Sequence, residues 1–115
     1  MTEIIYSYGT LRPGSDDTVL IDGSLYDLGW FPGIKLGEPG KVVCEKITVN
    51  DISQTDAYEG YNPRYPDESL YIRKPFKDGW IYEYNGRVNP IKLIQSGDWL
   101  DYTREKRGVN GGRFS

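Results

Sequence analysis

The chain has 115 residues, a formal net charge of −3, 37% hydrophobic residues and no histidine, and its length fits one domain with its own core. The acidic balance argues against general nucleic-acid binding, and no apolar stretch approaches the roughly 20 residues that span a membrane. We see no signal peptide, and the single Cys44 excludes an internal disulfide framework, so the expected compartment is the reducing cytoplasm.

The first predicted element is a buried strand over residues 3–8 that runs into the tetrapeptide Tyr8-Gly9-Thr10-Leu11. Its β-branched and aromatic residues are typical of a strand, and the glycine allows a sharp turn at its end. Such a turn can point successive backbone N–H groups outward and form a concave site for an anion such as a carboxylate. We therefore predict that at least two backbone N–H groups between Tyr8 and Leu11 are free of the sheet.

Two further strands are predicted over residues 24–30 and 41–49, with a glycine-rich loop over 33–40 between them. Because side chains alternate along a strand, the longer one places four residues on one face. They are Val43, Glu45, Ile47 and Val49. This face would be apolar apart from one carboxylate.

A short helix is predicted over residues 52–58, because Asn50 or Asp51 can cap its start and Gly60 can end it. Glu59 then lies at the C-terminus of the helix, where the helix dipole disfavours an anion. Helical spacing places Glu59 on one side together with Ile52 and either Thr55 or Asp56.

The second half of the chain contains more strands. Two prolines argue against regular structure over residues 62–68. Strands over 69–76 and 79–85 flank the hairpin signal Lys77-Asp78-Gly79, and a short last strand is predicted over 92–94. The fold is therefore expected to rest on about six strands.

Beyond Trp99 the chain becomes polar and basic, so we predict a domain over residues 1–102 and a polar basic C-terminal tail over 103–115. A helix over 99–106 is the alternative for the start of this segment. With six strands, one clear helix and many Gly and Pro residues, the predicted class is α+β, built on a mostly β core with one or two short helices.

The absence of histidine limits which residues can act as catalysts, because it removes the usual general base near neutral pH. Glu59 is the leading candidate, since its aromatic neighbours Tyr58 and Tyr61 can desolvate the carboxylate and raise its pKa. The competing interpretation is an ordinary surface glutamate. Three other carboxylates are rivals for the role: Glu45, Asp56 and Glu68.

Tyr71 and Arg73 alternate along a predicted strand and so share a side of it. If that side faces a pocket, Tyr71 can donate a hydrogen bond and Arg73 can pair with a carboxylate of the substrate. Otherwise they are a core tyrosine and a salt-bridged arginine. Cys44 has no histidine to activate it, so we interpret it as a small buried hydrophobic residue.

Several short motifs follow one another along nearly the whole chain. They are Tyr8-Gly9-Thr10-Leu11, residues 25–33, Glu59-Gly60, Tyr71-Ile72-Arg73, Trp80-Ile81-Tyr82 and residues 96–100. Their order resembles the gamma-glutamylcyclotransferase-like family. One departure is Cys44-Glu45, where the family often carries Gly-Glu.

The resemblance implies a small closed or nearly closed mixed β-barrel, with the helix that carries Glu59 packed at its side. It also implies a metal-free and cofactor-free enzyme whose substrate is a small-molecule gamma-glutamyl amide. The α-amino group of such a substrate attacks the side-chain carbonyl, closes the ring of 5-oxoproline and expels an amine. Glu59 would act as the general acid/base.

The substrate would be held by the tetrapeptide, namely Tyr8, Gly9, Thr10 and Leu11, together with Tyr71 and Arg73. The alternative is a non-catalytic binding module on the same fold that grips a small anionic ligand or a protein partner, because a fold does not fix a function. The sequence indicates no particular oligomeric state.

Overall fold

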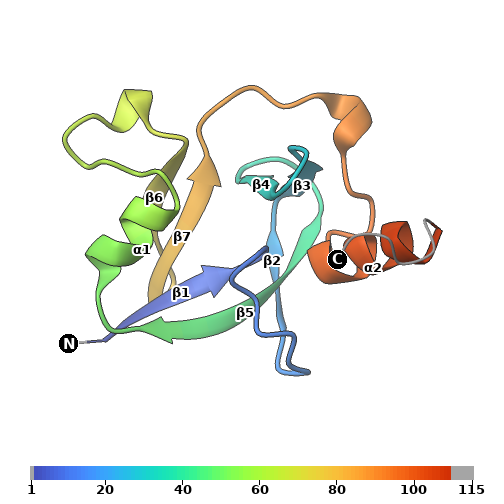
Figure 1. Ribbon diagram of the computed structural model, residues 1–115, viewed down its shortest axis with the longest axis horizontal. Helices are drawn as coiled ribbons and strands as arrows, with labels where there is room; N and C mark the ends of the chain where they lie inside the picture. Colours follow the sequence, from blue (N-terminus) through green and yellow to red (C-terminus); the bar gives the residue numbers. More distant parts are fainter. Residues whose placement is uncertain (1, 110–115) are drawn as a thin grey trace.

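The computed structural model describes residues 2–109, and its centre is a five-stranded mixed sheet (Figure 1). The strands of this sheet are β1 (Glu3–Ser7), β2 (Val19–Asp22), β5 (Lys41–Val49), β6 (Tyr71–Phe76) and β7 (Gly79–Tyr84). They lie in the order β2-β5-β1-β7-β6, in which β1 and β7 pair in parallel and the other neighbours pair antiparallel. A separate two-stranded sheet consists of β3 (Ser24–Asp27) and β4 (Pro32–Lys35).

Two α-helices complete the fold of residues 2–109, so the predicted α+β class is confirmed. The first is α1 (Ile52–Tyr58), as expected, and the second is α2 (Trp99–Val109). Figure 1 shows the two helices at opposite ends of the molecule. None of the helices described between residues 2 and 109 is long and apolar enough to cross a bilayer.

The strand pairs of residues 2–109 do not form the closed ring that a barrel requires. β2 and β6 are the outer strands of the five-stranded sheet, and β3 pairs with β4 alone apart from one bridge between Tyr26 and Leu93. Side chains rather than a backbone ladder attach the β3–β4 hairpin to β7. Lys35 donates through Nζ to the backbone oxygen of Tyr84 over 2.8 Å, and the backbone N–H of Leu36 donates to Glu83 over 2.8 Å.

Two predictions about the first half of the chain were wrong. The strand expected over residues 24–30 ends at Asp27, and the segment 33–40, expected as a loop, contains most of β4. Pro32 and Gly33 are poor strand formers, but here they form β4 where the chain approaches β7 closely. A Cβ atom on Gly33 would lie 2.8 Å from the Cβ of Tyr84, so only glycine fits without displacement. β2 was not predicted.

The second half requires smaller corrections. The segment 62–68 contains a 3₁₀ turn, Pro66–Glu68, because proline is tolerated at the first position of a helical turn. The short strand expected over 92–94 is replaced by another 3₁₀ turn, Pro90–Lys92, followed by the bridge at Leu93. α2 fulfils the alternative of a helix after Trp99, and residues 110–115 of the predicted tail lie outside the described residues.

The core lies between the five-stranded sheet and the β3–β4 hairpin. Six side chains, none of them charged, are almost completely buried there: Ile5, Leu25, Ile34, Val42, Cys44 and Ile81. On β5, Val42 and Cys44 lie on one face and belong to the core. Ile47 and Val49 lie on the opposite face, which was predicted to be apolar, and both are half-buried against the same core cluster. Lys46 and Thr48, which share the face of Val42 and Cys44, are exposed, so this face is covered only along the first half of β5.

Candidate active site

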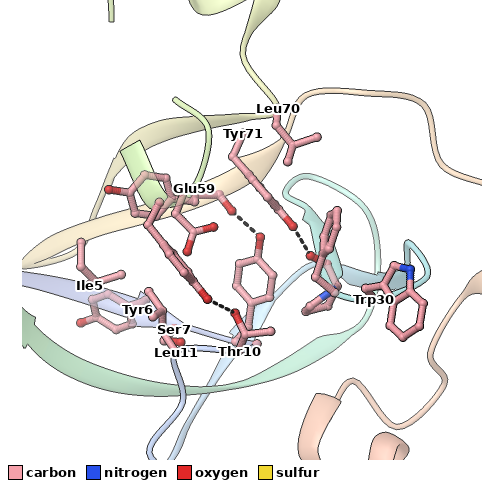
Figure 2. Close-up of a pocket in the computed structure, with 15 residues that line it drawn as sticks. Ile5, Tyr6, Ser7, Thr10, Leu11, Trp30, Glu59, Leu70 and Tyr71 are labelled. Atoms are coloured by element: carbon pink, nitrogen blue, oxygen red, sulfur yellow. Dashed lines mark hydrogen bonds between the residues drawn. The ribbon is translucent and has the colours of Figure 1, made fainter. Parts of the chain in front are cut away.

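A cavity of about 370 Å³ lies where the end of β1, the β3–β4 turn and the end of α1 meet (Figure 2). Six of the seven sequence-predicted site residues line it: Tyr8, Gly9, Thr10, Leu11, Glu59 and Tyr71. The tetrapeptide lies far from Glu59 and Tyr71 in the sequence, so tertiary folding brings these residues together. Arg73 is not among the lining residues.

The end of α1 fixes the position of Glu59. Asp51 caps the start of the helix by accepting a hydrogen bond from the backbone N–H of Ser53 over 2.9 Å. At the other end, Gly60 adopts a φ of +72°, and the backbone N–H of Tyr61 donates to the oxygen of Asp56 over 2.8 Å. This closure is a Schellman motif, which glycine favours. It leaves Glu59 as the C-cap, directly after Tyr58, with its side chain on the cavity.

Among the residues that the structure describes, Glu59 is the one charged residue that lines the cavity. Its carboxylate accepts no hydrogen bond from residues 2–109, and Figure 2 shows it in the middle of the lining side chains. Burial raises the pKa of the Glu59 carboxyl to about 7. A group with this pKa can both accept and release a proton near neutral pH.

The tetrapeptide supplies unpaired backbone donors, as the turn after β1 predicts. In the described part of the chain, the N–H groups of Gly9, Thr10 and Leu11 donate to no hydrogen bond. The turn is closed one residue later, where the N–H of Arg12 donates to the oxygen of Gly9 over 2.9 Å. A Cβ on Gly9 would lie 2.5 Å from Cγ of Pro32, so glycine permits the close approach of this turn to the hairpin.

Three tyrosines brace the wall of the cavity. The Tyr8 hydroxyl donates to the backbone oxygen of Tyr82 over 2.5 Å, and the Tyr71 hydroxyl donates to that of Pro32 over 2.5 Å. The Tyr82 hydroxyl in turn donates to Asp56 over 2.6 Å. Burial raises the pKa of each of these phenols, so all three remain protonated near neutral pH. The wall around Glu59 is therefore uncharged and held by hydrogen bonds.

Comparison with known proteins fits this geometry. A family model described as gamma-glutamyl cyclotransferase, AIG2-like, matches residues 5–101. The chain belongs to this family. The gamma-glutamylcyclotransferase family protein YtfP of Escherichia coli is 35% identical over 67% of each chain. A Citrobacter rodentium protein of the same name is 33% identical over 84% of this chain and 95% of its own length.

A solved structure supports the fold independently. The crystal structure of an uncharacterized protein from Pyrococcus horikoshii superimposes with a TM-score of 0.63, covering 92% of this chain and 97% of that one. Sequence identity over this match is 21%, so the likeness concerns the fold alone and not the activity.

In this gamma-glutamyl cyclotransferase family member, Arg73 is a salt-bridged arginine, which was the alternative interpretation of the sequence. Its Nη1 donates to Asp56 over 3.1 Å, and its guanidinium lies 4.5 Å from the centre of the Trp80 ring. Asp56, a rival carboxylate in the sequence, is thus engaged by both Arg73 and Tyr82. Through Asp56, Arg73 is connected to Tyr82, which lines the cavity, while Arg73 is itself not among the lining residues.

Glu45, which the sequence analysis placed as the one carboxylate on an otherwise apolar strand face, has a structural role. It is 1% exposed and accepts hydrogen bonds from Arg12, Gly14 and Ser15, the closest being 2.7 Å from the Ser15 hydroxyl. Burial raises the pKa of Glu45, but these hydrogen bonds outweigh it and lower the pKa to about 2. Glu45 is therefore ionised and fully engaged.

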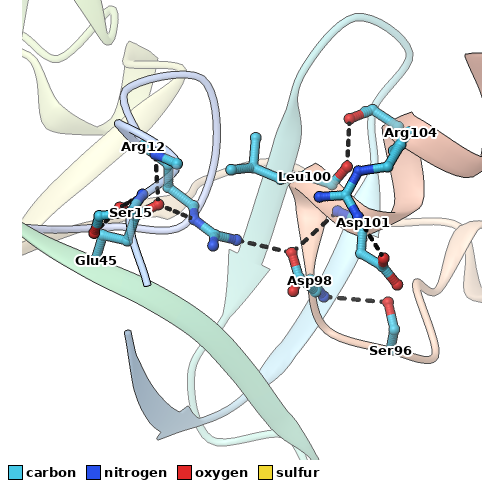
Figure 3. Close-up of polar contacts among 10 residues, drawn as sticks. Arg12, Ser15, Glu45, Ser96, Asp98, Leu100, Asp101 and Arg104 are labelled. Atoms are coloured by element: carbon cyan, nitrogen blue, oxygen red, sulfur yellow. Dashed lines mark hydrogen bonds and ion pairs between the residues drawn. The ribbon is translucent and has the colours of Figure 1, made fainter. Parts of the chain in front are cut away.

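Arg12, which sequence reasoning passed over, connects Glu45 to the start of α2 (Figure 3). Its Nε donates to Glu45 over 2.8 Å and its Nη1 to Asp98 over 2.9 Å, while the side chain is only 4% exposed. Asp98 also accepts the backbone N–H of Asp101 over 3.2 Å in the first turn of α2. Because Arg12 directly follows Leu11, this buried ion network fixes the turn that supplies the free N–H groups.

Cys44 is expected to be chemically inert. It is completely buried, and burial raises the pKa of its thiol to about 12, so the reactive thiolate is scarce near neutral pH. Alkylation by iodoacetamide, followed by mass spectrometry, should be at least about 10²-fold slower in native protein than in urea-unfolded protein. Any enzymatic activity should survive the treatment. Fast native alkylation with loss of activity would instead indicate a thiol mechanism.

Proposed function

We propose that the protein is a gamma-glutamyl cyclotransferase that releases 5-oxoproline and an amine from a gamma-glutamyl amide, with Glu59 as general acid/base. The observation that carries the proposal is the Glu59 carboxyl, whose pKa is raised to about 7, in a cavity beside unpaired backbone N–H groups. Family membership supports the same reaction class. The single unpaired cysteine is consistent with work in the cytoplasm.

The proposed reaction needs one proton carrier and one oxyanion site. The α-ammonium group of the substrate loses a proton to ionised Glu59, and the free nitrogen attacks the side-chain carbonyl carbon. The new C–N bond closes the five-membered ring, and the negative charge that develops on oxygen is stabilised by the N–H groups of Gly9, Thr10 and Leu11.

The original amide C–N bond then breaks, and Glu59 returns its proton to the leaving nitrogen. A second proton leaves the ring nitrogen as the lactam forms, so the amine departs as an ammonium ion and no proton is gained or lost overall. Because the attack is intramolecular, the protein mainly supplies orientation and proton transfer. These steps balance without a metal or cofactor.

A mass-spectrometric screen for 5-oxoproline tests this proposal. Purified protein is incubated with gamma-glutamyl amino acids, amines and peptides, and 5-oxoproline is quantified against a sample without protein. Release from at least one substrate is the expected result. No release from any of them would overturn the proposal in favour of a binding module on the same fold, which needs no carboxylate of near-neutral pKa.

The pH dependence of the reaction should report on Glu59. As the base, Glu59 must be ionised, so kcat/KM should fall about tenfold for each pH unit below its pKa of about 7. The measurement is kcat/KM between pH 4 and 9. Protein held at each pH and then assayed at pH 8 provides the control for unfolding. A break near the ordinary carboxyl pKa of 4.5 would contradict the assignment.

A further inference from the structure

The mouth of the cavity is rich in exposed apolar side chains. Trp30, Tyr58 and Leu70 all line the cavity and are all exposed, with Trp30 86% exposed. Burying the exposed indole against a ligand would stabilise the complex by roughly 25 cal/mol for each Å² of apolar surface removed from water. Exposed apolar groups gathered at a cavity, rather than scattered singly, are typical of a ligand-binding surface.

The turn that carries Trp30 is held in one conformation. The N–H of Leu28 donates to the oxygen of Phe31 over 3.0 Å, and the N–H of Gly29 donates to Asp27 over 2.7 Å. Gly29 adopts a φ of +114°, which favours glycine, and Asp27 also accepts the hydroxyl of Tyr102 on α2 over 2.6 Å. These hydrogen bonds hold the backbone that presents Trp30 at the mouth of the cavity, so this turn need not be reordered when a ligand binds.

The cavity has two ends of different polarity. Figure 2 shows Glu59 among the lining residues and Trp30 at their edge, on the side away from Ile5. Glu59 and the free N–H groups of residues 9–11 supply the polar end, while Trp30, Phe31 and Leu70 supply an apolar one. Among the described residues, no lysine or arginine lines the cavity, so a carboxylate at the apolar end would find no cation.

We propose that Trp30 selects gamma-glutamyl amides whose amine portion is an uncharged aromatic group. This inference rests on the proposed cyclotransferase function and names its substrate class. The glutamyl portion of the substrate lies at Glu59 and the free N–H groups, while the ring of the amine packs against the exposed indole. Aromatic pairs contribute beyond the area that they bury, and a carboxylate on the amine would lose its hydration at an apolar end where, among the described residues, no lysine or arginine lines the cavity.

The test compares three substrates and three proteins. The substrates are the gamma-glutamyl amides of phenethylamine, ethylamine and phenylalanine, the last of which carries the same ring with a carboxylate. The proteins are the wild type, Trp30→Ala and, as a matched control, Ile91→Ala. Ile91 is 87% exposed but does not line the cavity. The readout is kcat/KM for 5-oxoproline release.

For the wild type, kcat/KM should be at least about tenfold higher for the phenethylamide than for either other amide. Trp30→Ala should lower the ratio of phenethylamide to ethylamide about tenfold, and Ile91→Ala should leave this ratio unchanged. Equal kcat/KM for the phenethylamide and ethylamide, or a ratio unaltered by Trp30→Ala, would overturn the selection by Trp30. Higher kcat/KM for the phenylalanine amide would overturn the requirement for an uncharged amine.

A binding experiment separates failure of this inference from failure of the proposed function. If no amide releases 5-oxoproline, the cyclotransferase proposal is wrong, and calorimetry on Glu59→Gln then measures affinity for the intact amides. At least tenfold tighter binding of the phenethylamide, lost in the double variant with Trp30→Ala, would support aromatic selection without turnover. Equal affinities would overturn it.

Discussion

Replacing Glu59 by glutamine is expected to lower the turnover of a gamma-glutamyl amide by at least about 10²-fold, since general acid–base catalysis typically contributes 10²–10⁴-fold. Glutamine keeps the size of the side chain and can still form hydrogen bonds, but it cannot carry a proton. Substrate affinity should change little, because the free N–H groups of residues 9–11 remain. The measurement is single-turnover release of 5-oxoproline, combined with calorimetric binding of the intact amide.

Glu68→Gln is the matched control, because Glu68 is an exposed carboxylate that does not line the cavity. It should keep wild-type turnover. If Glu59→Gln also kept wild-type turnover on a confirmed substrate, the acid/base role would belong to another group. Loss of turnover together with loss of binding would indicate that the variant had damaged the site rather than the proton transfer.

The same variant should change how stability depends on pH. The pKa of Glu59 is about 7 in the folded protein and ordinarily 4.5, so the folded state holds the proton more tightly than the unfolded state. The wild type therefore loses stability as the pH rises from 4.5 to 7. At pH 8 Glu59→Gln should be more stable than wild type by on the order of 2 kcal/mol, and this gain should vanish below pH 4.5. Urea unfolding at both pH values measures the difference.

Replacing Glu45 by glutamine is expected to destabilise the fold by roughly 3 kcal/mol, because it removes the charge that compensates a buried arginine. Arg12 is 4% exposed and would keep Asp98 as its only ionic partner among residues 2–109. The backbone N–H groups of Gly14 and Ser15 would also lose the carboxylate that they share. The free energy of unfolding in urea at pH 7 is the measurement.

Asp22→Asn provides a control for this effect, since Asp22 and Lys41 form an ion pair whose side chains are both exposed. An exposed pair contributes about 0–1 kcal/mol, so this variant should unfold almost like the wild type. A loss of stability in Glu45→Gln as small as that of the control would show that the buried network is not a major support of the fold.

The contribution of Glu45 should also depend on pH in the opposite sense to that of Glu59. The pKa of Glu45 is about 2 in the folded protein and ordinarily 4.5. Its stabilisation is therefore fully present above pH 4.5 and is lost as the pH falls toward 2. The difference in unfolding free energy between wild type and Glu45→Gln should shrink over this range.

Local features of the sequence were sufficient to predict the elements that carry the candidate site. The limits of α1 follow from Asp51 at its start and Gly60 at its end, because capping and a left-handed glycine involve residues only a few positions apart. The β6–β7 hairpin likewise follows from Lys77-Asp78-Gly79. The absence of histidine and the order of the short motifs indicated Glu59 and the family, and the family model confirms the latter.

The features that the sequence left open depend on contacts between distant segments. Arg12 meets Glu45 and Asp98, which are 33 and 86 residues away, and no local pattern encodes such pairs. Arg73 could have faced a ligand, but Asp56 on α1 engages it first. The sequence by itself determined the helix, the turn after β1 and the candidate acid. Only the tertiary structure decided the pKa of that acid and the aromatic mouth of its cavity, because desolvation and exposure depend on how segments far apart in the chain pack together.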